Sequence, residues 1–390
     1  MPDTPNGEKH RHPALRTRIC EIFGIEYPII QTGMGWVAGA RLVSATSSAG
    51  ALGILASATM TLDELRRAIA EVKERTDQPF GVNLRSDHAD VDRFVDLLLS
   101  ERVAVASFAQ APNERLIKRL RDGGVRTMPT IAARRHAEKV AGWGVDAVIA
   151  QGHEGGGHTG AIPTSLLLPQ VCEAVGIPVV GAGGFFDGRG LVAALAWGAA
   201  GIAMGTRFLL TAESTVPDAV KQRYLEAAVT DTVVTRAVDG HPQRVIRTPM
   251  VDRLERALPG VGLARAGANA LRLRRITATP LPALVREGLA MRKGSDLTWA
   301  QTAMAANAPM LTRAALVEGS LDAGILPTGQ VAGLIDELPT VGELVQAVMC
   351  QAETTLDRLG RTNDPDDLDR PNGPNGPNGS NGPNGPNGPA

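Results

Sequence analysis

A short apolar run followed by a helical pattern recurs along most of this chain, and that repetition constrains the fold more than any other feature. The runs predict eight strands, over 27–30, 51–55, 79–83, 103–108, 126–130, 147–151, 178–182 and 201–206. The intervening patterns predict helices over 41–49, 61–75, 89–100, 112–122, 133–142, 164–175 and 189–197. Connections this short suit right-handed crossovers between parallel strands, so the sequence predicts an α/β fold, a (β/α)8 TIM barrel.

An open doubly wound sheet is the alternative fold. It is disfavoured because glycines and polar residues collect at the carboxyl ends of strands one, three, six, seven and eight, and a barrel brings those ends to one face. Chemistry is therefore expected at that face.

The glycine-rich stretch 150–160, Ala-Gln-Gly-His-Glu-Gly-Gly-Gly-His-Thr-Gly, follows the sixth strand. Glycine loses more backbone freedom on folding than any other residue, so a stretch this rich in glycine is costly for stability. The glycines therefore predict a backbone that approaches a ligand closely. His158 is the candidate acid or base, since imidazole changes charge near neutral pH. The alternative is a histidine that bonds to a local carbonyl. The residues His153, Glu154 and His158 lack the spacing of a helical metal site, so no metal is expected.

Two further glycine loops follow the seventh and eighth strands. Gly183-Gly184 and Gly205-Thr206 are placed to bind a phosphate through backbone N–H groups, as the corresponding loops of barrels do. The alternative is that these glycines only allow tight turns. Asn83 and Gln151 end strands three and six with amides, which can read the edge of a flat heterocycle such as an isoalloxazine ring.

The flanking segments complete the expected domain organisation. Residues 1–14 are predicted to be a disordered leader, and the Pro-Asn-Gly repeats of 361–390 a disordered tail. Residues 15–211 and 316–360 are predicted to form the barrel, and 212–315 a helical cap over its mouth. Alternatively, the segment 212–315 packs outside the barrel or forms an oligomer contact, since a homo-oligomer is possible on this sequence.

Composition excludes several classes of function. The 390 residues carry a net charge of -1 and only 3% aromatic side chains, which argues against nucleic acid and anionic membranes as partners. Three scattered cysteines, Cys20, Cys172 and Cys350, suggest neither disulfides nor a zinc knuckle, and Cys172 is expected in the core. Without a signal peptide or a spanning run, the chain is predicted to be cytoplasmic and to act on a small molecule.

Three segments resemble the nitronate monooxygenase family, formerly called 2-nitropropane dioxygenases. They are 151–160 (QGHEGGGHTG), 178–190 (PVVGAGGFFDGRG) and 204–208 (MGTRF). Within the family, 31–40 and 184–190 are most similar to an actinobacterial branch linked to breakdown of the steroid C and D rings. The resemblance implies a barrel that holds FMN without a covalent bond, with His158 as the catalytic residue. It implies that the flavin is bound by Gln31, Thr32, Gly33, Met34, Asn83, Gln151, Gly156, Gly184, Met204, Gly205 and Thr206.

The resemblance leaves three functions open. The first is an FMN-dependent oxidoreductase that oxidises a nitronate or a related acidic carbon through flavin. The second is a flavin dehydrogenase or reductase that acts on the CoA thioester of a steroid-derived intermediate, with NAD(P)H as electron partner. Arg244, Arg247 or Arg292 could then meet a CoA phosphate, although a solvated basic face is favoured for any single one of them. The third is a flavin-binding protein without turnover. A barrel that binds phosphate but no flavin would purify without colour.

Overall fold

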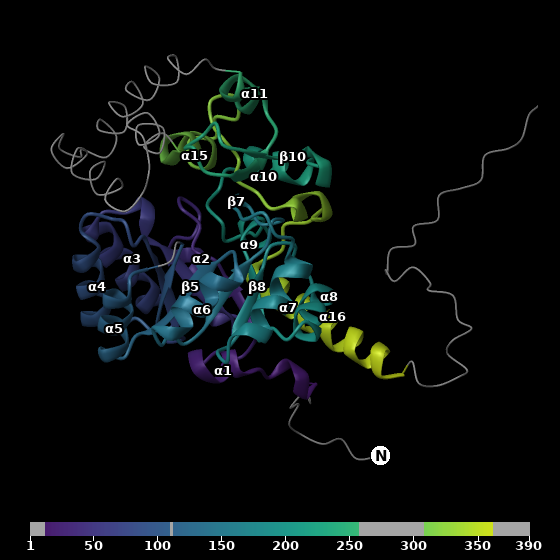
Figure 1. Ribbon diagram of the computed structural model, residues 1–390. Coiled ribbons are helices and arrows are strands. Elements are labelled where there is room, and N and C mark those ends of the chain that lie inside the picture. Colours follow the sequence, from purple (N-terminus) through teal and green to yellow (C-terminus); the bar gives the residue numbers. More distant parts are fainter. Residues whose placement is uncertain (1–11, 110–111, 257–307, 362–390) are drawn as a thin grey trace, which may run out of the picture.

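Eight parallel strands close into a barrel in the computed structural model, which describes residues 12–109, 112–256 and 308–361 (Figure 1). The barrel strands are β1 (Ile29–Gln31), β2 (Leu52–Ala56), β3 (Phe80–Leu84), β4 (Val105–Phe108), β5 (Arg126–Ile131), β6 (Val148–Gln151), β8 (Val179–Ala182) and β9 (Gly201–Met204). Ile30 of β1 lies opposite Leu52 on one side and Ala203 on the other, so the first strand joins the last. This closure confirms the TIM barrel and excludes the open sheet.

For the seven helices that the periodicity predicts, the ends are displaced by at most two residues. These helices and the last helix of the described residues surround the barrel. They are α2 (Ala40–Ser48), α3 (Leu62–Arg75), α4 (Val91–Ser100), α5 (Glu114–Asp122), α6 (Arg134–Gly142), α7 (Thr164–Ala174), α8 (Gly188–Ala196) and α16 (Val341–Arg361). The sequence Thr61-Leu-Asp-Glu64 is typical of a capping box, and α3 begins with one. The Thr61 side chain accepts from the backbone N–H of Glu64, and the Glu64 side chain accepts from the backbone N–H of Thr61. Helix α16 returns to the barrel and packs between α8 and α2, which completes the ring.

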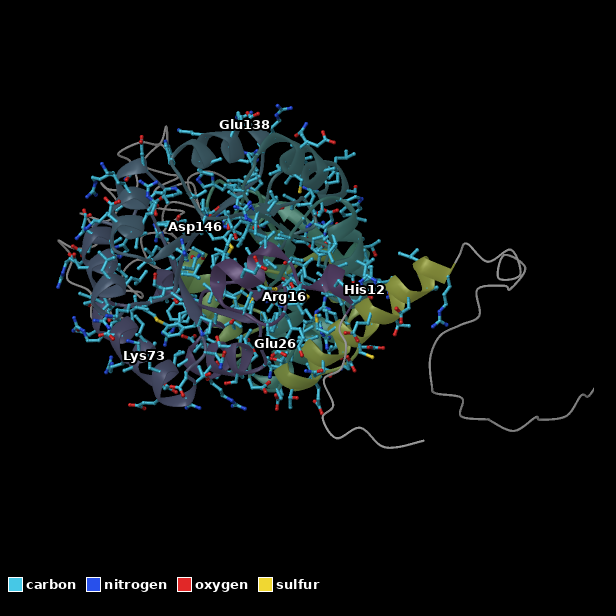
Figure 2. All side chains as sticks on the ribbon, turned by 90° about the horizontal axis from the view of Figure 1, so that it is seen from below. His12, Arg16, Glu26, Lys73, Glu138 and Asp146 are labelled. Atoms are coloured by element: carbon cyan, nitrogen blue, oxygen red, sulfur yellow. The ribbon has the colours of Figure 1, made fainter. Side chains whose placement is uncertain are left out.

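The core has two layers because successive strand residues face opposite sides of the sheet. One layer lies between the sheet and the helices. The other fills the barrel, where Ile30, Ile54 and Val105 meet side chains from helix α1 (Arg18–Phe23). Seen from the amino ends of the strands, α1 lies across this end of the barrel close to Arg16 (Figure 2). Helix α1 therefore plugs that end, and ligands must reach the barrel from the other.

Part of the expected leader has regular structure. Residues 13–15 form a turn of 3-10 helix, η1 (Pro13–Leu15), and Leu15 is buried. Burial of one leucine side chain is worth roughly 1.5–3 kcal/mol, enough to order a short segment beside α1. The rest of the leader and the tail after 361 lie outside the described residues. Within the described part of the chain, no helix is both long and apolar enough to cross a bilayer.

The segment after β9 lies at the carboxyl end of the strands, and it is not purely helical (Figure 1). Its helices are α9 (Thr206–Leu209), α10 (Asp218–Leu225), α11 (Pro249–Glu255) and α15 (Ala308–Leu316), with short 3-10 turns η3 (Val229–Asp231) and η4 (Gln330–Leu334). Strands β10 (Thr232–Thr235) and β11 (Gln243–Ile246) form an antiparallel hairpin. The expectation of a helical cap is wrong for this hairpin, whose β-branched residues favour a strand. Residues 257–307 of the expected cap lie outside the described residues.

Candidate active site

The glycine loops converge at the carboxyl end of the barrel, as predicted from their positions after strands. A Cβ atom on Gly33, after β1, would lie 2.5 Å from Cβ of Asn83, at the end of β3. One on Gly205, after β9, would lie 3.1 Å from Oγ1 of Thr32. The loops after β1 and β9 are therefore packed against each other and against Asn83 of β3, with the Met34 side chain beside Gly205. Met204, the last residue of β9, is instead buried in the core layer between sheet and helices.

His158 lies on a short strand, β7 (Gly157–His158), that forms a sheet with the hairpin of the cap. In the antiparallel register, Gln243 of β11 lies opposite His158, and Arg244 lies opposite Gly157. The His158 side chain is 57% exposed, and its Nε2 lies 2.7 Å from Oδ2 of Asp239. A histidine from the barrel thus meets a carboxylate from the cap.

Asp239 is a buried carboxylate with several hydrogen-bond donors around it. Its side chain is only 5% exposed. Oδ1 accepts from the backbone N–H of His241 at 3.0 Å, and Oδ2 accepts from the amide of Gln243. Burial alone would raise the pKa of Asp239, but the hydrogen bond and charge of His158 lower it below its usual value. The carboxylate is therefore ionised at neutral pH, and with the imidazole it forms a pair suited to proton transfer.

The amides expected to face a heterocycle make hydrogen bonds inside the protein. Gln151 donates from Nε2 to the carbonyl oxygen of His158 at 2.7 Å, so it holds the backbone of β7. Asn83 donates from Nδ2 to Oγ of Ser107 at 2.8 Å, at the top of the barrel interior. In both bonds the amide donates through its NH2 group, so the amide oxygen takes no part in them.

Gln31 contrasts with these two amides. Its Nε2 donates to the backbone carbonyl of Ile54 at 3.2 Å and to that of Thr32. Its Oε1 is buried. Among the buried side-chain nitrogen and oxygen atoms of the described residues, it is the one without a hydrogen-bond partner. A buried acceptor without a partner costs about 1–3 kcal/mol, so Gln31 marks a place where a donor from a ligand would be favoured.

The loop after β8 requires glycine at two successive positions. Gly183 and Gly184 have φ of +91° and +85°, which other residues adopt only with strain. The neighbouring helix α8 contributes less than expected, because its first amides are already bonded. Gly190 donates to Asp187 at 2.9 Å, and Gly188 donates to Oε1 of Gln351 at 2.7 Å. A phosphate here would bind the loop itself.

Gly156 and Thr206 contact the segment that returns from the cap. A Cβ on Gly156 would lie 2.5 Å from the backbone nitrogen of Gly329. That nitrogen donates to Oγ1 of Thr206 at 2.9 Å, and Gln330 donates to the carbonyl oxygen of Glu154 at 3.0 Å. Gly156 is therefore required by the close approach of residues 328–330, a role that the sequence analysis did not assign to it.

The remaining polar residues of the glycine-rich stretch hold the loop in place. The Glu154 carboxylate accepts from the backbone N–H and the hydroxyl of Thr164, at 2.9 and 2.8 Å, and so caps α7. The ring of His153 bonds to the carbonyl oxygen of Gly160 at 2.8 Å. Among the described residues, no group of three or more His, Cys, Asp or Glu side chains has the arrangement of a metal site.

Two of the three arginines considered for a CoA phosphate, Arg244 and Arg247, have partners inside the protein. Arg244 is buried and donates to the carbonyl oxygen of His153 at 3.1 Å and to Thr232 at 2.9 Å. Burial lowers its pKa, which the charge of Glu154 partly offsets. Arg247 pairs with Asp252 at 3.0 Å. Arg244 is therefore a structural residue that supports the loop, and Arg292 lies outside the described residues.

Asp239 and Gln243 are the site residues that the sequence analysis missed. A signal for them was present, because Asp-Gly at 239–240 stands between two runs of β-branched residues, and that pattern is typical of a hairpin turn. Because 212–315 was interpreted as helical, this hairpin signal was not used.

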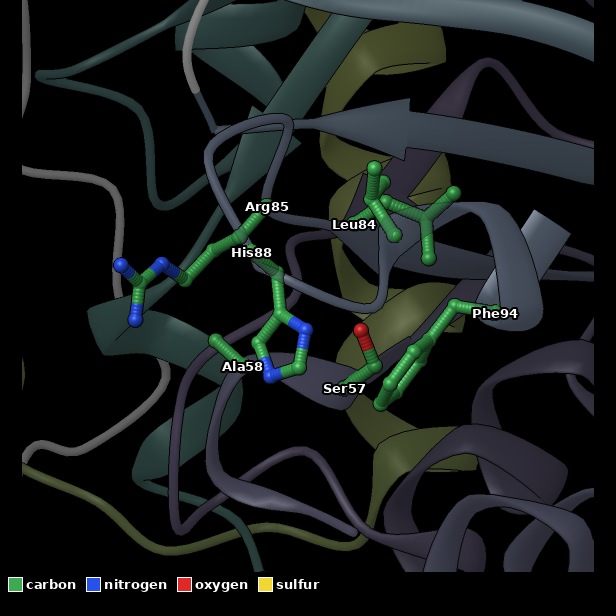
Figure 3. Close-up of a pocket in the computed structure, with 7 residues that line it drawn as sticks. Ser57, Ala58, Leu84, Arg85, His88 and Phe94 are labelled. Atoms are coloured by element: carbon green, nitrogen blue, oxygen red, sulfur yellow. The ribbon is translucent and has the colours of Figure 1, made fainter. Parts of the chain in front are cut away.

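A hollow lies on the same face, beyond the ends of β2 and β3 (Figure 3). It is partly open to solvent and is lined by Ser57, Ala58, Leu84, Arg85, His88, Val91 and Phe94. The His88 and Phe94 rings meet edge to face at 5.0 Å, and Arg85 pairs with Asp87 at 2.9 Å. In Figure 3 the guanidinium of Arg85 points away from the other labelled side chains. This hollow lies apart from the residues around His158.

Comparisons with known proteins agree with this geometry. A family model described as nitronate monooxygenase matches residues 16–94 and 88–351. The (3aS,4S,5R,7aS)-5-hydroxy-7a-methyl-1-oxo-octahydro-1H-indene-4-carboxyl-CoA dehydrogenase of Mycobacterium tuberculosis is 59% identical over 345 residues, which cover 88% of this chain and 97% of that protein. The dehydrogenase of the same name from Rhodococcus jostii is 56% identical over 346 residues, covering 89% and 98%. The structure of FabK from Thermotoga maritima superposes with a TM-score of 0.72 at 36% identity, covering 88% of this chain and 98% of that one.

Proposed function

Because this chain belongs to the nitronate monooxygenase family, we propose that it is an FMN-dependent dehydrogenase that acts on the CoA thioester of a bicyclic, steroid-derived acid. Its membership makes it an oxidoreductase. The substrate class rests on one observation, the 59% identity that extends over 97% of a dehydrogenase named for an octahydroindene carboxyl-CoA. Nicotinamide is proposed as the second electron partner.

The residues at the barrel mouth fit a flavin. Gln31 offers a buried acceptor that lacks a protein donor among the described residues, and such an acceptor suits the N–H edge of a heterocycle. Gly183 and Gly184 give a loop without side chains whose amides suit a phosphate. We propose that these residues hold FMN, together with Thr32 to Met34 and Met204 to Thr206. When bound, FMN supplies the acceptor for a hydride.

His158 supplies the proton chemistry in this proposal. In a dehydrogenation next to a thioester, the carbon beside the carbonyl loses a proton, the neighbouring carbon loses a hydride, and a double bond forms between the two carbons. The imidazole of His158 takes the proton. It is 57% exposed at the mouth and paired with an ionised carboxylate, so it is reachable by substrate and can hold the positive charge that it gains.

An anaerobic titration of the purified protein tests the proposal. We expect a flavin absorbance spectrum that bleaches when the octahydroindene carboxyl-CoA thioester is added, and a product that is lighter by two hydrogens. The matched control is the free acid without CoA, which should not bleach the flavin. A colourless protein, or a flavin that the thioester leaves oxidised, would contradict the proposal.

Nitronate oxidation is the second candidate, favoured by the description of the matching family model. The same titration with a nitronate in place of the thioester distinguishes the two. Bleaching by the nitronate alone would make the protein a nitronate monooxygenase, and bleaching by neither substrate would favour a flavin-binding protein without this turnover.

A further inference from the structure

The cap contributes a carboxylate to the catalytic histidine, and its placement has a mechanistic consequence. We propose that Asp239 is a positioning residue that keeps the Nε2 proton of His158 in place, so that Nδ1 is the atom that exchanges a proton with the substrate. Gln243 in turn holds Asp239. This inference deepens the proposed function and rests on it for the identity of the substrate.

The hydrogen-bond arrangement around Asp239 assigns the tautomer. The ionised carboxylate can only accept hydrogen bonds, so the nitrogen at 2.7 Å, Nε2 of His158, must carry a hydrogen. The Gln243 amide nitrogen also lies 3.2 Å from Nε2 of His158. Since Nε2 carries a hydrogen, both nitrogens are donors, and both donate to Oδ2 of Asp239 rather than to each other. In the neutral ring, the other nitrogen, Nδ1, is left as the acceptor.

The sheet between barrel and cap fixes the geometry of this pair. Gln243 lies directly opposite His158 in the β7–β11 register. Asp239 lies in the turn that joins β10 to β11, four residues before Gln243. Because a shift of register by one residue would turn Gln243 to the other face, the pairing determines whether the carboxylate meets the imidazole. The hairpin is therefore part of the active site as well as part of its cover.

The other titratable groups near His158 leave Asp239 as its partner. The His241 ring, on the hairpin turn, lies edge to face with the His158 ring at 6.0 Å between centroids, an aromatic contact. Arg244 on β11 is bonded to the carbonyl oxygen of His153, and Glu154 on the loop after β6 is bonded to Thr164.

The first test reads the tautomer directly and does not depend on turnover. The full-length protein is labelled with 15N at histidine and measured by NMR at about pH 8. The His158 signals are assigned as those missing from the His158→Gln variant. We expect the His158 ring to be protonated at Nε2. In Asp239→Asn, the side-chain amide can donate to Nε2, and the ring is expected to move toward the Nδ1-protonated form. A wild-type ring protonated at Nδ1 would overturn the proposal.

The second test measures kinetics with the thioester. Asp239→Asn is expected to lower kcat by about 10²- to 10⁴-fold, the range found where a carboxylate orients a catalytic histidine, with KM changed less than about threefold. The acid limb of the kcat profile is expected to move to lower pH, because an ionised carboxylate favours the protonated imidazole. Asp239→Glu should recover part of the rate. Asp252→Asn, which removes a carboxylate of the cap that pairs with Arg247, is the matched control and should keep the wild-type rate.

A double variant separates positioning from a structural role. If Asp239 acts through His158, the His158→Ala and Asp239→Asn double variant should be no slower than His158→Ala alone. An equal loss from Asp239→Asn in both backgrounds, or a rate and pH profile unchanged by it, would overturn the proposal. If the thioester is not turned over at all while the ring is protonated at Nε2, the proposed function fails and the positioning by Asp239 stands.

Discussion

Trp36 donates its indole N–H to the backbone carbonyl of Pro309 at 3.0 Å, which ties the loop after β1 to helix α15 of the cap. The guanidinium of Arg313 lies over the same indole ring, 5.1 Å from its centroid. The loop that carries Gln31 to Met34 is therefore held from above by the cap, at the place where we propose that flavin binds.

Replacing Trp36 by Phe tests this link. The change removes one hydrogen bond and weakens the contact with Arg313, so we expect the free energy of unfolding to fall by about 1–2 kcal/mol. Flavin should also dissociate more readily. Urea unfolding and FMN retention during gel filtration measure the two effects. Trp143→Phe, which perturbs an indole near Lys139 on α6, is the control and should leave FMN retention unchanged.

Gly156 is expected to tolerate no side chain. In Gly156→Ala, the new methyl group would meet the backbone at Thr328 and Gly329, and backbone cannot move aside as a side chain can. We expect a loss of about 1–3 kcal/mol in the free energy of unfolding together with loss of flavin. Gly142→Ala is the matched control, because nothing lies within 4 Å of its new methyl group at the end of α6. If both variants unfold alike, the close approach of residues 328–330 is not what requires Gly156.

The three cysteines should differ in their reactivity toward iodoacetamide. Burial raises the pKa of Cys172 to about 11 and also raises the pKa of Cys20, whereas Cys350 is exposed on α16. At pH 8 only about one Cys172 in a thousand is then a thiolate, the form that reacts. Mass spectrometry should find rapid modification of Cys350, and of the other two only after unfolding. Modification of Cys172 at the same rate as Cys350 in the folded protein would contradict this.

The capping box of α3 predicts a contribution to stability that depends on pH. Hydrogen bonds from the backbone of Thr61 lower the pKa of Glu64, an effect that slight burial opposes. Because the folded-state pKa lies below the unfolded value of about 4.3, the contribution is present above that value and is lost as pH falls through the folded pKa. Glu64→Gln should therefore be less stable than wild type at pH 7, and the difference should shrink below about pH 4. Urea unfolding at several pH values measures it. Glu74→Gln, an exposed position on the same helix, should show no such change with pH.

The position of each glycine loop could be predicted from the sequence because a parallel barrel allows little choice. Parallel strands of such a barrel all end at the same face, so Gly33, Gly183 and Gly205 had to lie at that face once the strands were identified. The capping residues Thr61 and Glu64 were also predictable, since their bonds span three residues. What these residues bind is a proposal that the sequence and the structure support together.

The hydrogen-bond partners of the amides could not be predicted in this way. Gln151 and Asn83 end strands as expected, yet each is bonded to a protein partner that only the packing defines, the carbonyl oxygen of His158 and the hydroxyl of Ser107. Arg244 was an attractive phosphate ligand by composition, and burial between β11 and the glycine-rich stretch gives it a different role.

By itself, the sequence determined the barrel, the face that carries chemistry and His158 as the residue to test, because hydrophobic periodicity and strand ends are local properties of the chain. Only the tertiary structure decided what stands beside that histidine. Asp239 is 81 residues away in sequence, and it reaches Nε2 because β11 pairs with β7 in one register. Such a register depends on how two distant segments pack against each other, and no local pattern of residues specifies it.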